Sequence, residues 1–342
     1  QRDVEIILNN PIDWEQFRNK TVLVTGATGR LGMYIVEAIS KADIDWNLNV
    51  TIIALARNKK KLEEVFGESL KLPNIHVLVQ DVTEPINWDG DVHYIFHTAG
   101  LASPQDFTNH PVDTLWGHVQ GTRNVLELAR THNGEKVLYV STVEIYGEWK
   151  SEDGIKETDM GVMRCDNARA CYPEAKRLCE TMLAAYEMQY GIQYVGVRLC
   201  HTFGPGIVLN DGRAFSEFIR NVLEGKDIVL QTDGSAERTY TYVADAIGAM
   251  LLAFTKGKEN YYNIANLDNL ISIRDLAKLI VNLDPKGKSK VVFADGVEQK
   301  LKYLPFKLGI MDVTRINQLG WNPQVDLEHA FRYTMESFQQ RS

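Results

Sequence analysis

The sequence predicts an α/β fold in which a doubly wound parallel sheet carries a smaller, interleaved α/β cap that binds the substrate. Apolar, β-branched runs alternate with helical patterns from Val22 to Leu199, and this alternation is typical of a parallel sheet with helices on both faces. A glycine-rich turn lies between the first apolar run and the first helical pattern. Beyond residue 206 the rhythm becomes irregular, which indicates where the chain begins to build the cap.

Each element is expected from its own pattern. β-branched, apolar runs predict buried strands, and apolar residues at helical spacing predict helices. The strands expected in the sheet are residues 21–24, 50–56, 75–80, 94–98, 136–141 and 193–199, with helices at 33–39, 59–66, 112–131 and 173–190. In the second half we expect helices at 215–224, 244–255, 273–283 and 327–338, and strands at 228–231 and 261–265. We assign residues 1–199 and about 240–262 to the sheet domain, and about 200–239 and 263–342 to the cap.

The composition excludes several classes of protein. Of the 342 residues, 44% are hydrophobic and 24% charged, and the formal net charge is -8. This balance argues against a general nucleic-acid or membrane-surface binder. No apolar run approaches the roughly 18 residues that cross a bilayer. The four cysteines (Cys165, Cys171, Cys179 and Cys200) show neither a metal-binding nor a disulfide pattern. We therefore expect no metal and a cytoplasmic location.

The turn after the first strand predicts a dinucleotide site. Three glycines with the spacing Gly-x-x-Gly-x-x-Gly follow Val22–Val24 and precede a helix. In such a turn the first glycine permits the sharp bend, the second lets backbone N–H groups approach a pyrophosphate, and the third lets the helix pack on the strand. The helix N-terminus adds partial positive charge. The cofactor contacts expected from this turn are Gly26, Thr28, Gly29, Arg30, Leu31 and Gly32.

A second constellation predicts chemistry. Tyr172 and Lys176 are four residues apart at the start of an expected helix, so they share one helical face. Beside a cationic nicotinamide ring, the lysine would favour the phenolate, which requires a pKa change of roughly 3 units, or about 4 kcal/mol. The strand 136–141 delivers Thr142 and Glu144 to the carboxyl edge of the sheet, where doubly wound sheets bind ligands. We predict these four residues as catalytic.

Together these motifs resemble the extended short-chain dehydrogenase/reductases that modify nucleotide sugars, from Val22 to about Phe338. The resemblance implies a Rossmann sheet, with Tyr172 and Lys176 as the catalytic pair and Thr142 at the family's Ser/Thr position. In this family the helices that match 112–131 and 173–190 usually pair across a two-fold axis, so the resemblance implies a homodimer. The further cofactor contacts that it implies are Asp81, Val82, Thr98, Ala99 and Gly100.

Within the family, the segments 168–177, 210–219 and 237–243 look most like the UDP-glucuronate decarboxylases. This resemblance implies a nucleotide-diphosphate sugar that is oxidised transiently at C4 and loses carbon dioxide from C6. Tyr172 would take the C4 hydroxyl proton, and Glu144 would assist proton movement at C5. Arg238 would hold the diphosphate or the carboxylate with its bidentate fork. The substrate contacts implied are Val143, Glu144, His201, Arg213 and Arg238.

Four departures from the family pattern bear on substrate and cofactor. His118 and His201 stand where asparagine is usual, and we interpret both as packed hydrogen-bond donors rather than pH-sensitive contacts. The segment Lys307–Met311 replaces an arginine-rich nucleotide contact. Arg57 stands at the end of the second strand, where an acidic residue would bind the ribose 2′-hydroxyl of NAD. The resemblance favours NAD, and Arg57 leaves NADP as the alternative.

Other functions are compatible with the same motifs. A 4,6-dehydratase would use the same C4 ketone and lose water from C6, whereas a 4-epimerase has no need of Glu144. In a different class, a non-catalytic NAD(P)-binding sensor would keep the fold without turnover. Such proteins generally lose the Tyr–Lys pair, which this sequence retains in Tyr172 and Lys176.

Overall fold

The computed structural model describes residues 1–149, 153–284, 286–294 and 310–339, and it is built on a seven-stranded parallel sheet. The strands have the order β10-β6-β5-β4-β1-β2-β3, with β1 between β2 and β4. Their bounds are β1 (Thr21–Thr25), β2 (Thr51–Ala56), β3 (Ile75–Val79), β4 (Tyr94–His97), β5 (Lys136–Thr142), β6 (Gln193–Leu199) and β10 (Tyr261–Ile264). The strand order runs outward from β1 in both directions, so the predicted doubly wound sheet is confirmed.

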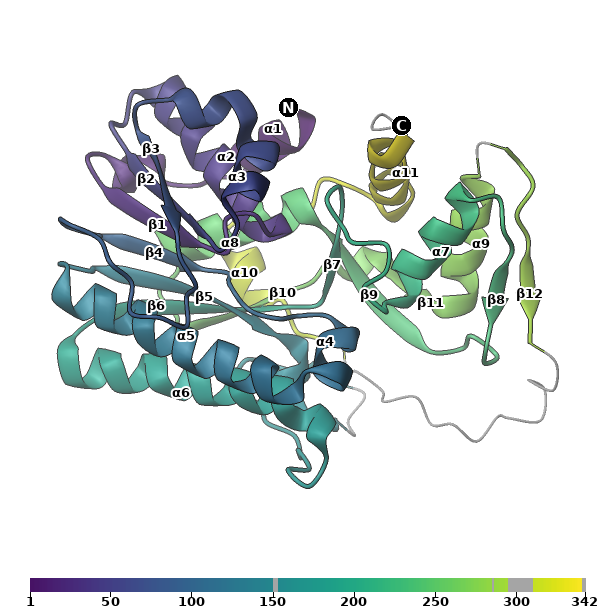
Figure 1. Ribbon diagram of the computed structural model, residues 1–342. Coiled ribbons are helices and arrows are strands. Elements are labelled where there is room, and N and C mark those ends of the chain that lie inside the picture. Colours follow the sequence, from purple (N-terminus) through teal and green to yellow (C-terminus); the bar gives the residue numbers. More distant parts are fainter. Residues whose placement is uncertain (150–152, 285, 295–309, 340–342) are drawn as a thin grey trace.

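Helices cover both faces of this sheet (Figure 1). One face carries α1 (Arg2–Leu8), α2 (Arg30–Trp46), α3 (Lys59–Phe66) and α8 (Val243–Lys256), and the other carries α5 (Pro111–Thr131) and α6 (Cys171–Tyr190). Neighbouring strand residues alternate between two apolar cores: Val22 and Val24 pack with α2 and α8, whereas Leu23 packs under α5 and α6. Burial on both faces explains why the strands read as continuous apolar runs.

The smaller part of the chain lies beside the sheet, at the right of Figure 1. It holds a three-stranded sheet of order β11-β9-β7 and a parallel β12-β8 pair. These strands are β7 (His201–Phe203), β8 (Ile228–Leu230), β9 (Glu237–Tyr242), β11 (Leu270–Ser272) and β12 (Val291–Phe293). The remaining helices are α4 (Pro104–Asn109), α7 (Ala214–Leu223), α9 (Ile273–Asn282), α10 (Thr314–Gln318) and α11 (Leu327–Gln339). Short 3-10 turns are η1 (Trp14–Phe17), η2 (Gly67–Lys71), η3 (Val143–Tyr146), η4 (Ala168–Ala170) and η5 (Leu267–Asn269).

Long periodic elements agree with the prediction, whereas short ones depend on tertiary contacts. The helix at 59–66 and the strand at 193–199 match to the residue, and β8 matches the strand expected at 228–231, but α1, β7, β9, β11 and β12 are not predicted. Asp3 holds α1 in place because its carboxylate accepts hydrogen bonds from Tyr34 at 2.6 Å and Tyr242 at 2.8 Å. The division into two domains stays a prediction; the seven-stranded sheet extends to Ile264.

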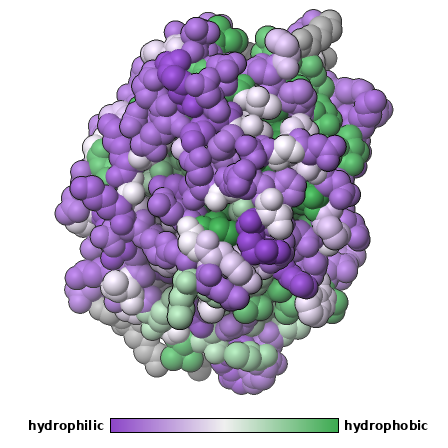
Figure 2. Space-filling view, turned by 90° about the vertical axis from the view of Figure 1, so that its left-hand side faces the viewer, coloured by the Kyte–Doolittle hydropathy of each residue, from purple (hydrophilic) through white to green (hydrophobic). Residues whose placement is uncertain are grey.

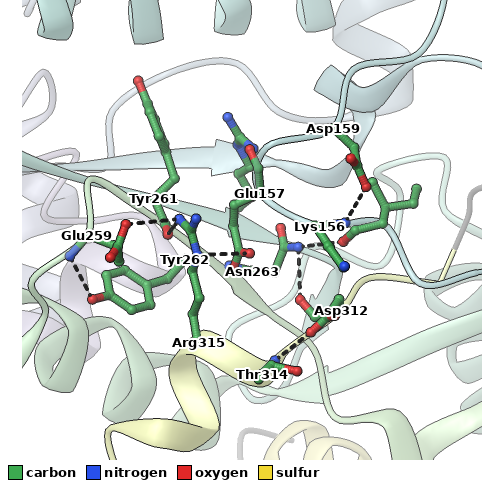
Figure 3. Close-up of polar contacts among 12 residues, drawn as sticks. Lys156, Glu157, Asp159, Glu259, Tyr261, Tyr262, Asn263, Asp312, Thr314 and Arg315 are labelled. Atoms are coloured by element: carbon green, nitrogen blue, oxygen red, sulfur yellow. Dashed lines mark hydrogen bonds and ion pairs between the residues drawn. The ribbon is translucent and has the colours of Figure 1, made fainter.

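The edge strand β10 is covered by two loop segments (Figure 3). Asn263 is fully buried, and its Nδ2 donates to the carbonyls of Ile155 at 2.8 Å and Asp312 at 3.0 Å. Its backbone N–H donates to Glu157 at 2.9 Å, and Arg315 lies 3.5 Å from the same carboxylate. These contacts satisfy an edge that would otherwise present unpaired backbone groups to other chains.

The side of the molecule away from the cap is mostly hydrophilic, with only small hydrophobic areas (Figure 2). Within the described ranges no helix is both long and apolar enough to cross a membrane.

Candidate active site

The glycine turn lies at the carboxyl end of β1, at the point where the strand order of the sheet reverses. Ligands of doubly wound sheets bind at this position. Gly26 has φ +65°, and a Cβ there would lie 2.9 Å from the backbone of Ala99. A Cβ at Gly32 would lie 2.4 Å from the Gly26 carbonyl oxygen. The turn is therefore too tightly packed for side chains at these positions, and the start of α2 can present its N–H groups to an anion.

The loop after β4 packs against this turn. Thr98 donates its hydroxyl to the Thr25 carbonyl at 2.7 Å, and the Ala99 N–H donates to the Thr25 hydroxyl at 3.3 Å. Gly100 has φ +152°, and a Cβ there would lie 2.1 Å from the ring of His118. The structure thus places Thr98, Ala99 and Gly100 beside the glycine turn, where the sequence predicts the cofactor.

Arg57 and Asp81 lie at the ends of neighbouring strands. Arg57 Nη1 is 3.7 Å from the Asp81 carboxylate, and its side chain is 71% exposed. Burial acts to raise the pKa of Asp81, but hydrogen bonds from Thr83 and the charge of Arg57 outweigh it and lower the pKa. The buried Val82 accepts a hydrogen bond from Asn124 Nδ2 at 2.9 Å on its carbonyl. The two predicted adenosine-side contacts, Asp81 and Arg57, are therefore neighbours.

The predicted catalytic residues meet where α6 crosses the end of β5. Lys176 Nζ donates to the Val140 carbonyl at 2.7 Å and lies 5.8 Å from the ring centre of Tyr172. Thr142 lies close enough to the Tyr172 side chain to lower its pKa. Tyr172, Lys176 and Thr142 are all buried. The end of β5 and the start of α6, about thirty residues apart in the sequence, thus lie together at the carboxyl edge of the sheet, as the sequence predicts.

Burial controls the protonation of both groups on α6. It lowers the pKa of Lys176 to about 8, so the amine is a cation at neutral pH. Burial raises the pKa of Tyr172, the charge of Glu144 adds to the rise, and the neighbouring Thr142 acts in the opposite direction. The phenol is therefore protonated in the protein alone. Formation of the phenolate requires the further positive charge that we expect beside the ring.

Glu144 is paired with an arginine that the sequence argument does not single out. Both of its oxygens accept from Arg169 Nη2, at 3.0 and 2.9 Å. Arg169 also lies 4.6 Å from the ring centre of Phe107, which stacks on Tyr172 at 4.3 Å. The position of Arg169, three residues before Tyr172, is the signal that could have identified it. Phe107 comes from α4, and no local pattern indicates its role.

Val143 is buried and belongs to the same apolar cluster as Ile145 and Tyr146. Its contact with a substrate stays a prediction.

The two unusual histidines are both packed and neutral. His118 Nε2 donates to the Leu101 carbonyl at 2.9 Å, and burial followed by the charge of Lys176 lowers its pKa well below the usual value. Burial lowers the pKa of His201 to about 3, and the charges of Arg238 and Arg213 act in the same direction. The interpretation of His118 as a packed donor agrees with this geometry.

The cap brings two guanidinium groups near His201. Arg213 precedes α7, pairs with Asp211 and donates to the Ala102 carbonyl. Arg238 lies on β9, and its Nη1 donates to the Glu237 carbonyl at 2.7 Å. This positive region suits an anionic ligand. The predicted segment Lys307–Met311 lies largely outside the described residues.

These features fit a dinucleotide. The glycine turn and the start of α2 offer backbone N–H groups to a phosphate. In the part of the chain that the structure describes, no group of three His, Cys, Asp or Glu side chains could hold a metal ion. The four cysteines are free thiols.

The fold and the site define a dinucleotide-binding α/β protein of the short-chain dehydrogenase type. Residues 22–265 match the model of the NAD dependent epimerase/dehydratase family. UDP-glucuronic acid decarboxylase 1 of Xenopus tropicalis is 30% identical over 322 residues, which cover 93% of this chain and 72% of that protein. The chain therefore belongs to the NAD dependent epimerase/dehydratase family.

Two solved structures share the fold. UDP-glucose 4-epimerase of Thermotoga maritima, solved with UDP-glucose, has a TM-score of 0.77 and 23% identity and covers 94% of this chain and 99% of its own. UDP-glucuronic acid 4-epimerase of Bacillus cereus was solved in complex with UDP-glucuronic acid and NAD. It has a TM-score of 0.76 and 21% identity, and the match covers 94% of this chain and 100% of the Bacillus cereus chain. At these identities the likeness concerns the fold alone.

Replacing Gly32 by alanine should weaken dinucleotide binding strongly and destabilise the protein by about 1–3 kcal/mol through overpacking. The added methyl would lie 2.4 Å from the Gly26 oxygen and 2.9 Å from Ala27 Cα, so the turn must open. Gly117→Ala in α5 is the matched control, because its methyl meets no heavy atom within 4 Å. Urea unfolding and fluorescence titration with NAD measure both effects. Unchanged NAD affinity in Gly32→Ala would contradict the assignment of the glycine turn as the dinucleotide site.

Proposed function

We propose that this protein is a nucleotide-sugar-modifying enzyme that removes the C6 carboxylate of UDP-glucuronate through transient oxidation at C4. The observation that carries the proposal is the meeting of Thr142, Tyr172, Lys176 and Glu144 at the end of β5, beside the glycine cradle. The relative from Xenopus tropicalis, which bears the name UDP-glucuronic acid decarboxylase, supports the choice of reaction.

In the first step, the oxidation at C4, Tyr172 acts as the general base. The residues of the glycine turn would hold NAD, which would supply a hydride acceptor for C4 and would be regenerated within the cycle. Tyr172 takes the proton of the C4 hydroxyl, and the neighbouring Thr142 favours the phenolate by lowering the pKa of the phenol. Lys176 is a cation at neutral pH and stabilises the phenolate through its charge.

The second step follows from the position of the new carbonyl. The C4 carbonyl is β to the C6 carboxylate, so the C5–C6 bond breaks, carbon dioxide leaves and the electron pair enters an enolate. Glu144 relays one proton from solvent to C5, and its partly exposed side chain allows this. Tyr172 then returns its proton to the C4 oxygen as the hydride returns to C4. No external reductant is consumed.

Charged groups in the cleft hold the anionic substrate. Arg169, next to Glu144, offers a cationic partner to the sugar carboxylate. Arg213 and Arg238 offer their guanidinium groups to the diphosphate, for which a planar fork is better suited than an ammonium. The neutral imidazole of His201 lies near both guanidinium groups, whose charges lower its pKa.

NAD is the cofactor in this proposal. The reaction returns the hydride, so it needs no reductant from the cell. Arg57 is the feature that favours NADP, but Asp81 already lies 3.7 Å from its guanidinium. A 2′-phosphate would have to compete with this carboxylate. The Bacillus cereus neighbour, whose structure contains NAD, supports the same choice.

A 4,6-dehydratase is the second candidate, because it would use the same C4 ketone and would also need Glu144. A 4-epimerase fits less well, since it requires no acid–base group at C5. A non-catalytic sensor has no need for a buried phenol near Thr142 or for a buried lysine cation.

Mass analysis separates the reactions. We expect UDP-glucuronate incubated with the protein and NAD to lose the mass of carbon dioxide, and NADP to support little turnover. The same incubation is run with UDP-glucose, GDP-mannose and dTDP-glucose. Loss of water from any of them would identify a dehydratase, and an isomer of unchanged mass would identify an epimerase. No change in any sugar would contradict the enzymatic proposal.

Replacing Tyr172 by phenylalanine should lower kcat by roughly 10²–10⁴-fold, because it removes the general base while leaving the ring stack with Phe107. The affinities for NAD and UDP-glucuronate should change little. Tyr186→Phe is the matched control on the same helix; its hydroxyl bonds Glu127 away from the site. Steady-state kinetics and equilibrium titration distinguish the two variants. Full turnover by Tyr172→Phe would refute the assigned mechanism.

We also propose a cytoplasmic homodimer. Large apolar side chains are exposed on two helices that pack together, namely Val112 and Trp116 on α5 and Leu178 and Met188 on α6. A second copy of the chain would cover them. The free cysteines suit a reducing compartment.

Sedimentation equilibrium should give a dimer mass for the native chain and a monomer mass for Trp116→Asp, because the new charge would be buried in the interface. An exposed tryptophan on the opposite side of the sheet domain, Trp46, provides the control in Trp46→Asp. A monomeric native chain would overturn this part of the proposal.

A further inference from the structure

Lys176 lies over an aromatic ring that the proposed mechanism does not use. Its Nζ is 4.7 Å from the ring centre of Tyr139, within the roughly 6 Å over which an ammonium is attracted to the face of an aromatic ring. Tyr139 lies on β5, three residues before Thr142, and it belongs to the apolar core under α5 and α6. Both Lys176 and Tyr139 are buried, and a cation–π contact is strongest where water is excluded.

Buried polar contacts fix the surroundings of the Tyr139 ring. The ring centre of His97 is 5.8 Å from that of Tyr139. The two nitrogens of this imidazole are hydrogen-bonded to the hydroxyls of Thr25 at 2.8 Å and Thr122 at 3.2 Å. The Thr122 hydroxyl also lies 3.2 Å from Cys179 Sγ, to which it donates. The ring therefore packs against a wall that hydrogen bonds from β1, β4, α5 and α6 hold in place.

The other titratable groups near Lys176 give its charge little support. These groups come from four elements, namely Tyr139 on β5, His97 on β4, His118 on α5, and Tyr172, Cys179 and Glu180 on α6. Burial lowers the pKa of both histidines and raises the pKa of the thiol and of both phenols, so these groups are neutral at pH 7. Glu180 is charged, but its carboxylate is already paired with Arg198 at 2.7 Å.

The charge of Lys176 is nevertheless needed beside Tyr172. Burial lowers the pKa of Lys176 to about 8, and the charge of Glu180 acts in the opposite direction. A positively charged nicotinamide ring, which we expect near Tyr172, would disfavour the ammonium further. A carboxylate in the place of Tyr139 would support the ammonium, but it would also raise the pKa of Tyr172, as Glu144 does. An aromatic face attracts the ammonium without adding a net charge.

We propose that Tyr139 is a positioning residue whose ring face keeps Lys176 charged inside the buried site, so that Lys176 can stabilise the phenolate of Tyr172. The Tyr139 hydroxyl is buried and has no hydrogen-bond partner among the described residues, so the ring rather than the hydroxyl has this role. The consequence for C4 oxidation rests on the proposed function, whereas the support of the ammonium by the ring does not.

The first test measures the pKa of Lys176 without substrate or cofactor, by NMR titration of the protein labelled with ¹³C at the lysine ε carbons. The Lys176 resonance is assigned by its absence from Lys176→Met. In Tyr139→Leu the pKa of Lys176 should fall by about one pH unit, because a desolvated cation–π contact is lost. Tyr139→Phe keeps the ring, so its Lys176 should titrate like that of the native chain.

Phe96→Leu is the matched control for a lost ring in the core. Phe96 is fully buried on the neighbouring strand β4 and belongs to the apolar core on the other face of the sheet, so the pKa of Lys176 should not change. Tyr139→Met also lacks the ring but fills more of its space, and it replaces Tyr139→Leu if that variant does not fold. An unchanged pKa in the ringless variant would overturn the proposal, as would an equal fall in Tyr139→Phe or Phe96→Leu.

The second test follows kcat/KM for UDP-glucuronate against pH, with saturating NAD. Turnover requires the charged form of Lys176, so kcat/KM should fall as the pH rises through the pKa of this amine. The fall should occur about one pH unit lower in Tyr139→Leu than in the native chain, Tyr139→Phe and Phe96→Leu. A loss by the same factor at every pH would show a merely structural effect and would overturn the role of Tyr139 in catalysis.

The proposed function and the role of Tyr139 fail in different experiments. If no nucleotide sugar is turned over, the proposed function is wrong, and the NMR titration still decides whether Tyr139 supports the charge of Lys176. If Lys176 titrates normally in Tyr139→Leu while UDP-glucuronate is decarboxylated, the proposed function stands and the role of Tyr139 is refuted. Thermal melting of each variant checks that it is folded.

Discussion

A buried ion pair between Arg198 on β6 and Glu180 on α6 holds the candidate site together. Arg198 donates from Nε and Nη2 to the carboxylate at 3.1 and 2.7 Å, and both residues are almost completely buried. Ser141, next to Thr142, donates to the same carboxylate at 2.6 Å, and Arg198 Nη1 reaches the Tyr146 hydroxyl at 2.9 Å. Removing one partner would leave a buried charge uncompensated, at a cost of about 3–5 kcal/mol.

This ion pair joins the elements that carry the proposed catalytic residues and so fixes their relative positions. α6 carries Tyr172 and Lys176, β5 ends at Thr142, and η3 carries Glu144. With these elements held in place, hydrogen bonds and charges are preorganised before a ligand arrives, which is the main source of electrostatic catalysis. The glycine turn forms the other side of the candidate site. There the backbone of Gly26 packs directly on the backbone of Ala99, with no side chain between them. The cap shares one apolar cluster with the sheet domain, and hydrogen bonds of Arg30 and Arg213 also join the two parts.

The predictable part of the site consists of residues whose role follows from local spacing. Tyr172 and Lys176 share a helix face, Thr142 ends a buried strand, and the three glycines lie within one turn, so periodicity and motif were sufficient. The pairing of Glu144 with Arg169 joins residues 25 positions apart, and that of Arg30 with Thr202 spans 172 positions. No local pattern encodes such contacts. The burial of the Val143 side chain is also not encoded locally, because it depends on how the turn η3 packs after β5.

The sequence by itself determined the doubly wound sheet and the glycine turn, and it named the residues that we propose as catalytic. Hydrophobic period, glycine spacing and residue chemistry act within one element, and they require no knowledge of the rest of the chain. Only the tertiary structure decided the protonation of Tyr172, the partner of Glu144 and the neutral state of His118 and His201. These properties depend on desolvation and on charges supplied by distant segments. Burial and long-range pairing exist only once the elements are packed together.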